Sequence, residues 1–148
     1  AQGHADHLEG KVLLRCFFHG ASGPHRMRAA VRFCVSSEGP PGTAHGGSVI
    51  AVFEHAALHA CGVPVGWILP GGSTPRLRRC SVTYKAQVPL DETLRLDMRV
   101  VGTPAVEPGG ARVLKVEGEL RSASLYGPGK LEYDTCEAEI EIPPAPRL

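Results

Sequence analysis

The sequence has no long apolar run and no strong excess of charge of either sign. None of its apolar stretches reaches the roughly 18 residues that a membrane-spanning helix needs. Sixteen Lys and Arg against 15 Asp and Glu give a formal net charge of +1, which argues against a nucleic-acid-binding surface. The first residues show no signal-peptide pattern. We therefore expect an intracellular protein, cytoplasmic or organellar, with no integral membrane segment and no nucleic-acid partner.

The five cysteines are odd in number and contain no C-x-x-C pair. This usage argues against a disulfide framework and indicates reduced thiols in an intracellular protein. Cys61, at the end of an apolar segment, is predicted to be a core thiol rather than a nucleophile. His55 and His59 have the i, i+4 spacing of metal ligands on a helix, but no third ligand follows at a convincing spacing. We predict neither a metal nor a cofactor.

The chain of 148 residues suits one domain with its own core. The order of elements starts with a strand at 29–35, followed by a Pro- and Gly-rich breaker at 38–42. A helix at 47–61 is apolar or small on nearly every face and is predicted to be buried all round. The pattern of residues 8–18 is compatible with either a short helix or an irregular lead-in. We expect a lead-in at 1–28, a domain at 29–143 and a tail at 144–148.

The second half of the chain alternates between apolar and polar residues, as half-buried strands do. The apolar positions are Cys80, Val82, Tyr84, Ala86 and Val88, then Leu94, Leu96, Met98 and Val100, then Leu114, Val116 and Leu120, then Cys136, Ala138, Ile140 and Ile142. Turns are expected at 89–92, 104–110 and 126–130, and a short strand at 66–69. The sequence therefore predicts an α+β fold in which an antiparallel sheet wraps around one long central helix.

Glu54 is the one acid within the apolar helix. Burying an unpaired carboxylate costs several kcal/mol, or forces the group to keep its proton. A His-Gly-Gly turn at 45–47 precedes the helix, and a helix N-terminus offers backbone N–H groups to negative charge. The pattern indicates a catalytic acid and a nearby anion-stabilising turn.

Two motifs resemble a known family. Residues 38–47 read EGPPGTAHGG, with Glu54 nine positions after His45, and residues 84–90 read YKAQVPL. Together they are similar to the PaaI-like acyl-CoA thioesterases of the hotdog fold, and most similar to the branch of thioesterase superfamily members 4 and 5. The resemblance covers the chain from about Arg32 to Ile142. It implies a hotdog fold, thioester hydrolysis and a role in lipid metabolism.

The chain departs from that pattern at two positions. The branch has Asp where this chain has Glu54, although some other hotdog thioesterases use Glu there. The branch also has a Thr, which helps to hold the attacking water, seven residues before the strand Tyr. This chain has Leu77 at that position, and Thr74, Ser81 or Thr83 are the candidate substitutes.

The resemblance assigns catalytic roles to three residues. The Gly46 N–H is the main oxyanion donor, Glu54 is the general base or the nucleophile, and His45 orients the substrate carbonyl or the loop. Gly46 and Glu54 are eight positions apart, which is about 12 Å along a helix. One helix cannot bring both to one carbonyl group, so the site must combine two subunits. We expect a homodimer, and the resemblance extends this to a homotetramer as the alternative.

The predicted substrate is an acyl thioester of coenzyme A or of an acyl carrier protein. The expected substrate-binding residues are Gly47, Thr74, Arg76, Arg78 and Thr83. The basic cluster at 76–79 is either a solvated strand end or a contact for the nucleotide phosphates. Two other functions stay open. One is hydration or dehydration of acyl thioesters on the same fold, and the other is acyl-CoA binding without catalysis, which Leu77 favours.

Overall fold

The computed structural model describes residues 3–8, 12–18, 26–61, 75–123 and 132–144, and the side chains from residue 27 onward. These parts contain the α-helix α1 (Gly46–Ala60) and the short 3₁₀ turn η1 (Val35–Ser37). The strands are β1 (Gly3–Leu8), β2 (Val12–Phe18), β3 (Arg26–Phe33), β4 (Arg76–Tyr84), β5 (Thr93–Val106), β6 (Arg112–Ser122) and β7 (Glu132–Ile142).

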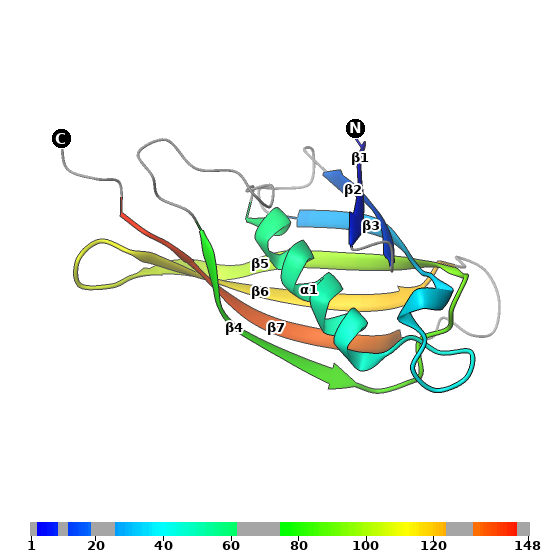
Figure 1. The fold of residues 1–148 in the computed structure, drawn as a ribbon. Coiled ribbons are helices and arrows are strands. Elements are labelled where there is room, and N and C mark those ends of the chain that lie inside the picture. Colours follow the sequence, from blue (N-terminus) through cyan, green and yellow to red (C-terminus); the bar gives the residue numbers. More distant parts are fainter. Residues whose placement is uncertain (1–2, 9–11, 19–25, 62–74, 124–131, 145–148) are drawn as a thin grey trace.

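The seven strands form one sheet in the order β1-β2-β3-β5-β6-β7-β4. Every pairing in it is antiparallel. Helix α1 lies across one face of this sheet (Figure 1). Strand β4 pairs with β7 on one side and ends the sheet on the other. The fold is the predicted α+β arrangement, a hotdog fold with an antiparallel sheet around one long helix.

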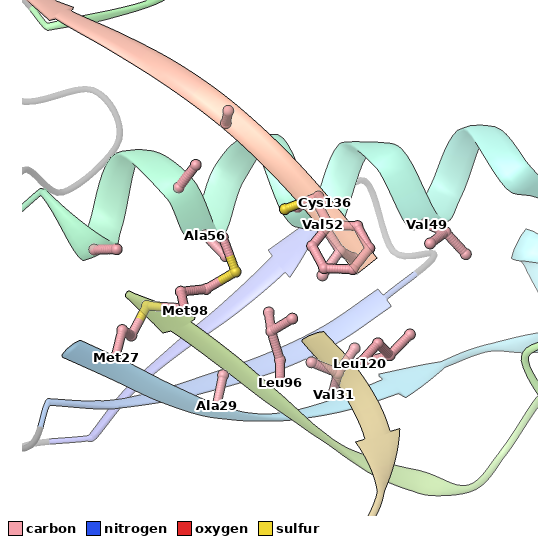
Figure 2. Packing of buried hydrophobic residues seen from close by; sticks show 14 of the residues in the cluster. Met27, Ala29, Val31, Val49, Val52, Ala56, Leu96, Met98, Leu120 and Cys136 are labelled. Atoms are coloured by element: carbon pink, nitrogen blue, oxygen red, sulfur yellow. The ribbon is translucent and has the colours of Figure 1, made fainter. Parts of the chain in front are cut away.

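The core lies between α1 and the face of the sheet that it covers (Figure 2). From the helix, Val49, Val52 and Ala56 point toward the sheet, where Leu96 and Leu120 meet them. Full burial of an aliphatic side chain of this size contributes about 1.5–3 kcal/mol. This layer therefore contributes most of the free energy that keeps α1 packed on the sheet. The helix itself is 15 residues long and too short to cross a membrane.

The period-two patterns of β5, β6 and β7 are confirmed. Their predicted apolar positions are buried or half-buried on the helix side, and the alternating charged residues lie on the other face. Strand β5 is longer than expected and continues through Pro104 to Val106. Its register shifts between Val101 and Ala105, and Gly102 has φ +70°. Because the bulge leaves that stretch partly unpaired, the proline is tolerated there.

Two expectations about the fold are wrong. Residues 8–18 are neither a helix nor irregular, because most of them lie in strands β1 and β2, which extend the sheet beyond β3. The helix is not buried all round, because Gly47 and Ala51 are exposed and Ile50, Glu54 and Leu58 are half-buried. Within the described part of the chain, one stripe of α1 is left uncovered.

Some predicted features lie outside the described residues. These are the short strand at 66–69, Thr74 and the turn at 126–130. The division of the chain at 28/29 and 143/144 stays a prediction.

Candidate active site

The two motifs of the sequence meet in space at the start of α1. The loop between Glu38 and Ala44 closes on itself, because the Glu38 carboxylate accepts a hydrogen bond from the Gly42 N–H at 3.1 Å. Gly42 has φ +75°, a conformation that glycine adopts without the strain of a side chain. The Ala44 N–H then donates to the Val88 carbonyl at 2.8 Å. The segment after β4 therefore fixes the loop that leads into the helix.

His45 is the N-cap of α1. Its Nδ1 accepts a hydrogen bond from the Gly47 N–H at 2.8 Å. This bond satisfies one of the four N–H groups that a helix N-terminus leaves without an intrahelical partner. The proton of the neutral ring therefore lies on Nε2. His45 thus caps the first turn of α1, and its role toward a substrate stays a prediction.

Gly46 and Gly47 differ in what their N–H groups do. The Gly47 N–H is already engaged by His45, so it is not available to a substrate. Gly46 is the first residue of α1 and is exposed, and an N–H at this position has no partner within the helix. Of the two glycines, Gly46 is the one able to donate to a bound oxygen atom.

Tyr84 supports the same turn from the sheet. Its hydroxyl donates to the Gly46 carbonyl at 3.0 Å, and a Cβ at position 46 would lie 3.5 Å from the ring. Tyr84 is nonetheless 56% exposed, although its strand pattern predicted an inward position. Tyr84 is not among the site residues predicted from the sequence. The sequence signal that points to Tyr84 is its place at the start of the second motif, residues 84–90.

Glu54 is half-buried rather than fully buried. It lies on the uncovered stripe of α1, on the same side of the helix as Gly47 and Ala51. Its neighbours in sequence are apolar, but within the described part of the chain this side of the helix stays partly open.

The predicted substrate-binding residues do not gather in one place. Arg76 forms an ion pair with Glu141 at 2.7 Å, and Arg78 pairs with Glu107. Strand alternation places Thr83 and Ser81 on the face opposite Tyr84, away from α1. Both are therefore unsuitable for holding a water beside Glu54. Leu77 packs against the core.

The described residues contain no group of three or more His, Cys, Asp or Glu that could hold a metal ion. His55 and His59 do meet, with their Nε2 atoms 3.1 Å apart. Burial raises the pKa of Cys61 to about 12. That thiol is therefore protonated at neutral pH, in agreement with its predicted place in the core.

A hollow lies on the charged face of the sheet, away from α1. It has a volume of about 720 Å³. Its arginines are neutralised by carboxylates, as in the pairs of Arg28 with Asp97 at 2.7 Å and of Arg99 with Glu117 at 2.6 Å. We therefore place the candidate site at α1 and β4 and not in this hollow.

Comparisons with known proteins agree with this fold. No protein-family model matches the chain, and no curated protein sequence matches it. Several solved structures do. A thioesterase superfamily protein superposes with a TM-score of 0.56 at 23% identity, over 86% of this chain and 54% of its own.

Two further structures match over most of both chains. A hypothetical thioesterase from Streptococcus pneumoniae TIGR4, crystallised with coenzyme A, has a TM-score of 0.60 at 12% identity, with 80% of this chain and 79% of that one covered. Zebrafish thioesterase superfamily member 2 has a TM-score of 0.57 at 11% identity, with coverage of 89% and 81%. The chain thus has the hotdog fold of thioesterase superfamily proteins, as the resemblance of its motifs implies.

Proposed function

We propose that this protein hydrolyses acyl thioesters of coenzyme A or of an acyl carrier protein. The observation that carries the proposal is the N-terminus of α1, where His45 and Tyr84 hold the turn and the Gly46 N–H stays open. A backbone donor aimed at a developing oxyanion is typically worth about 2.7–4 kcal/mol in rate. The matching fold of thioesterase superfamily proteins supports the same reaction class.

In this proposal Glu54 is the general base that activates water, or the nucleophile that forms an anhydride. It lies eight positions after Gly46 in α1, which is about 12 Å along the axis. The Gly46 that serves a given Glu54 must therefore belong to a second copy of the chain.

Among the described strands, β4 has one edge without a partner strand, and this edge supports a homodimer. A free edge strand presents unsatisfied N–H and C=O groups that readily pair with another strand. Pairing of two β4 edges would bring the open stripes of two helices close to each other and create two equivalent sites. This arrangement would also cover Glu54. A homotetramer built from two such dimers is the further possibility that the resemblance implies.

We propose that Arg76 and Arg78 bind the phosphates of coenzyme A. Both are exposed on β4, and both already pair with carboxylates, so phosphate would replace Glu141 and Glu107 as the partner. Arg78→Glu should weaken coenzyme A binding, measured by calorimetry. Unchanged affinity would contradict this role.

A thiol-release assay with acetyl-, hexanoyl- and benzoyl-CoA tests the function. We expect wild-type hydrolysis of at least one substrate, and a loss of about 100-fold or more in Glu54→Gln. Glu137→Gln is the matched control, because Glu137 is an exposed acid on the opposite face of the sheet. Binding of acyl-CoA without any thiol release would favour a non-catalytic acyl-CoA-binding protein. Loss of water from a hydroxyacyl-CoA, or addition of water to an enoyl-CoA, would favour a dehydratase or hydratase.

A further inference from the structure

Asp134 on β7 is a buried acid that the proposed reaction does not use. Its exposed fraction is 1%, and it takes part in none of the ion pairs formed among the described residues. A buried carboxylate without a countercharge is unfavourable unless hydrogen bonds replace its lost contacts with water. The donors that its oxygen atoms hold therefore indicate what the group does.

These donors lie where the chain leaves β4. In the pairing of β4 with β7, Asp134 is opposite Tyr84, the last residue of β4. The Oδ1 atom of Asp134 accepts a hydrogen bond from the Lys85 N–H at 2.9 Å. The Tyr133 carbonyl accepts from the N–H groups of Lys85 and Ala86 at 3.2 and 3.1 Å. Strand β7 thus fixes the backbone at the start of the second motif, and Asp134 accepts the shortest of these bonds.

The segment that Asp134 anchors also holds the start of α1, which lies beside the end of β4 (Figure 1). The Tyr84 hydroxyl donates to the Gly46 carbonyl at 3.0 Å. The Val88 carbonyl accepts from the Ala44 N–H at 2.8 Å. These two bonds lie on either side of the N-cap residue. A shift of the segment would therefore move the turn that carries the open N–H group.

Asp134 also acts on Tyr84 directly. Residues opposite each other in an antiparallel pair point to the same face of the sheet, and their Cβ atoms are about 4.5–5.5 Å apart. Burial, and after it the charge of Asp134, raises the pKa of Tyr84. The phenol therefore keeps its proton and remains a donor to the Gly46 carbonyl.

We propose that Asp134 is a positioning residue for the turn at Gly46. This inference rests on the proposed function and adds to it a residue that does not touch the substrate. By holding the Lys85 N–H, the carboxylate sets the place of Tyr84 and so the direction in which the Gly46 N–H points. A misplacement of about 1 Å in a site can lower a rate by about 100-fold. Because the charge on the oxyanion develops in the transition state, kcat should respond more than KM.

Steady-state kinetics, with the acyl-CoA that the wild type hydrolyses fastest, test the role. Asp134→Leu removes the acceptor at a similar volume, and should lower kcat by about 10- to 100-fold while KM stays within about twofold. Asp134→Asn keeps an oxygen atom for the Lys85 N–H and should recover most of the rate. Cys136→Ala is the matched control, because Cys136 is buried on the same strand, and it should leave kcat within about twofold.

A double-variant cycle separates positioning from general damage to the core. If Asp134 acts through Tyr84, the loss of kcat in Asp134→Leu combined with Tyr84→Phe is smaller than the product of the two single losses. Single losses that simply multiply would overturn the positioning role. An equal loss of kcat in Cys136→Ala would overturn it as well.

Amide chemical shifts give a readout that needs neither substrate nor catalysis. In isotope-labelled Asp134→Asn, whose melting temperature shows that it is folded, the weaker acceptor should shift the Lys85 amide signal, and the Gly46 amide should shift with it. A Gly46 signal that stays at its wild-type position while Lys85 moves would overturn the proposal and leave the hydrolase function standing. Coupled shifts in a protein that hydrolyses no acyl-CoA would support the role of Asp134 at the turn and refute the proposed function.

Discussion

Replacing Gly47 by alanine tests how the start of α1 is built. A Cβ at this position would lie 2.7 Å from Cε1 and 2.9 Å from Nδ1 of His45. Separations this short force the ring away, so the hydrogen bond from the Gly47 N–H to the ring is lost. At Gly46, by contrast, a Cβ would meet Tyr84 at 3.5 Å, which is an ordinary contact. Gly46→Ala is therefore a matched control.

The expected magnitudes follow from two opposing contributions. Alanine is preferred to glycine in a helix by about 1 kcal/mol, and this gain applies to both variants. Loss of an N-cap costs about 0.5–2 kcal/mol, typically about 1, and applies to Gly47→Ala alone. We expect Gly46→Ala to be about 1 kcal/mol more stable than Gly47→Ala, a difference of about 2–4 °C in melting temperature.

Urea denaturation of both variants, in the wild-type and the His45→Ala backgrounds, gives the free energies of unfolding. With the ring removed, Gly47→Ala has nothing to displace, so the difference between the two glycine variants should disappear. Equal stabilities in the wild-type background would refute the steric argument. A difference that persists after His45→Ala would show that the His45 ring is not its cause.

Three further predictions concern the sheet and its contact with α1. Tyr84→Phe removes the hydrogen bond to Gly46 at an exposed position, and should change the free energy of unfolding by under about 1 kcal/mol. It should also lower kcat for thioester hydrolysis, and an unchanged kcat would contradict the role of Tyr84 in supporting the turn at Gly46. Gly118→Ala places a Cβ 2.3 Å from the Met98 sulfur, and should cost about 1–3 kcal/mol by overpacking, measured by urea denaturation; wild-type stability would contradict it. Burial raises the pKa of Asp134, against the backbone N–H donors that lower it, so the folded state holds this proton more tightly than the unfolded chain. Stability should therefore fall as pH rises between the ordinary pKa of an aspartate and the raised value, and Asp134→Asn should remove this slope in denaturation curves; an unaltered slope would contradict it.

Strand periodicity made most of the sheet predictable from the sequence. Leu94, Leu96 and Met98 alternate with charged residues, and such a pattern places one face of a strand in the core. Strands β1 and β2 were missed because residues 8–18 mix polar and apolar side chains without a clear period. Their place in the sheet is decided by pairing with β3, which local sequence does not report.

The site was predictable in part. The position of His45 before the helix follows from the recognisable His-Gly-Gly turn. The position of Gly46 follows from the predicted start of the helix. The exposure of Glu54 was not predictable, because an apolar helix sequence reads the same whether the chain itself or a second subunit covers it.

The central claim is that each site combines Gly46 of one subunit with Glu54 of the other, and mixed dimers test it directly. Gly46→Pro removes the N–H alone, because proline is favoured at the first position of a helix and His45 before it is already extended, at φ −64° and ψ 136°. Each variant by itself, Gly46→Pro or Glu54→Gln, should be inactive.

Unfolding the two variants together and refolding them at equal concentrations should make about half of the dimers mixed. Each mixed dimer has one site with both wild-type groups, so about one quarter of the wild-type hydrolytic activity should return. If both groups acted within one subunit, every site would carry a lesion. A mixture that remains as inactive as its two components would contradict the shared site.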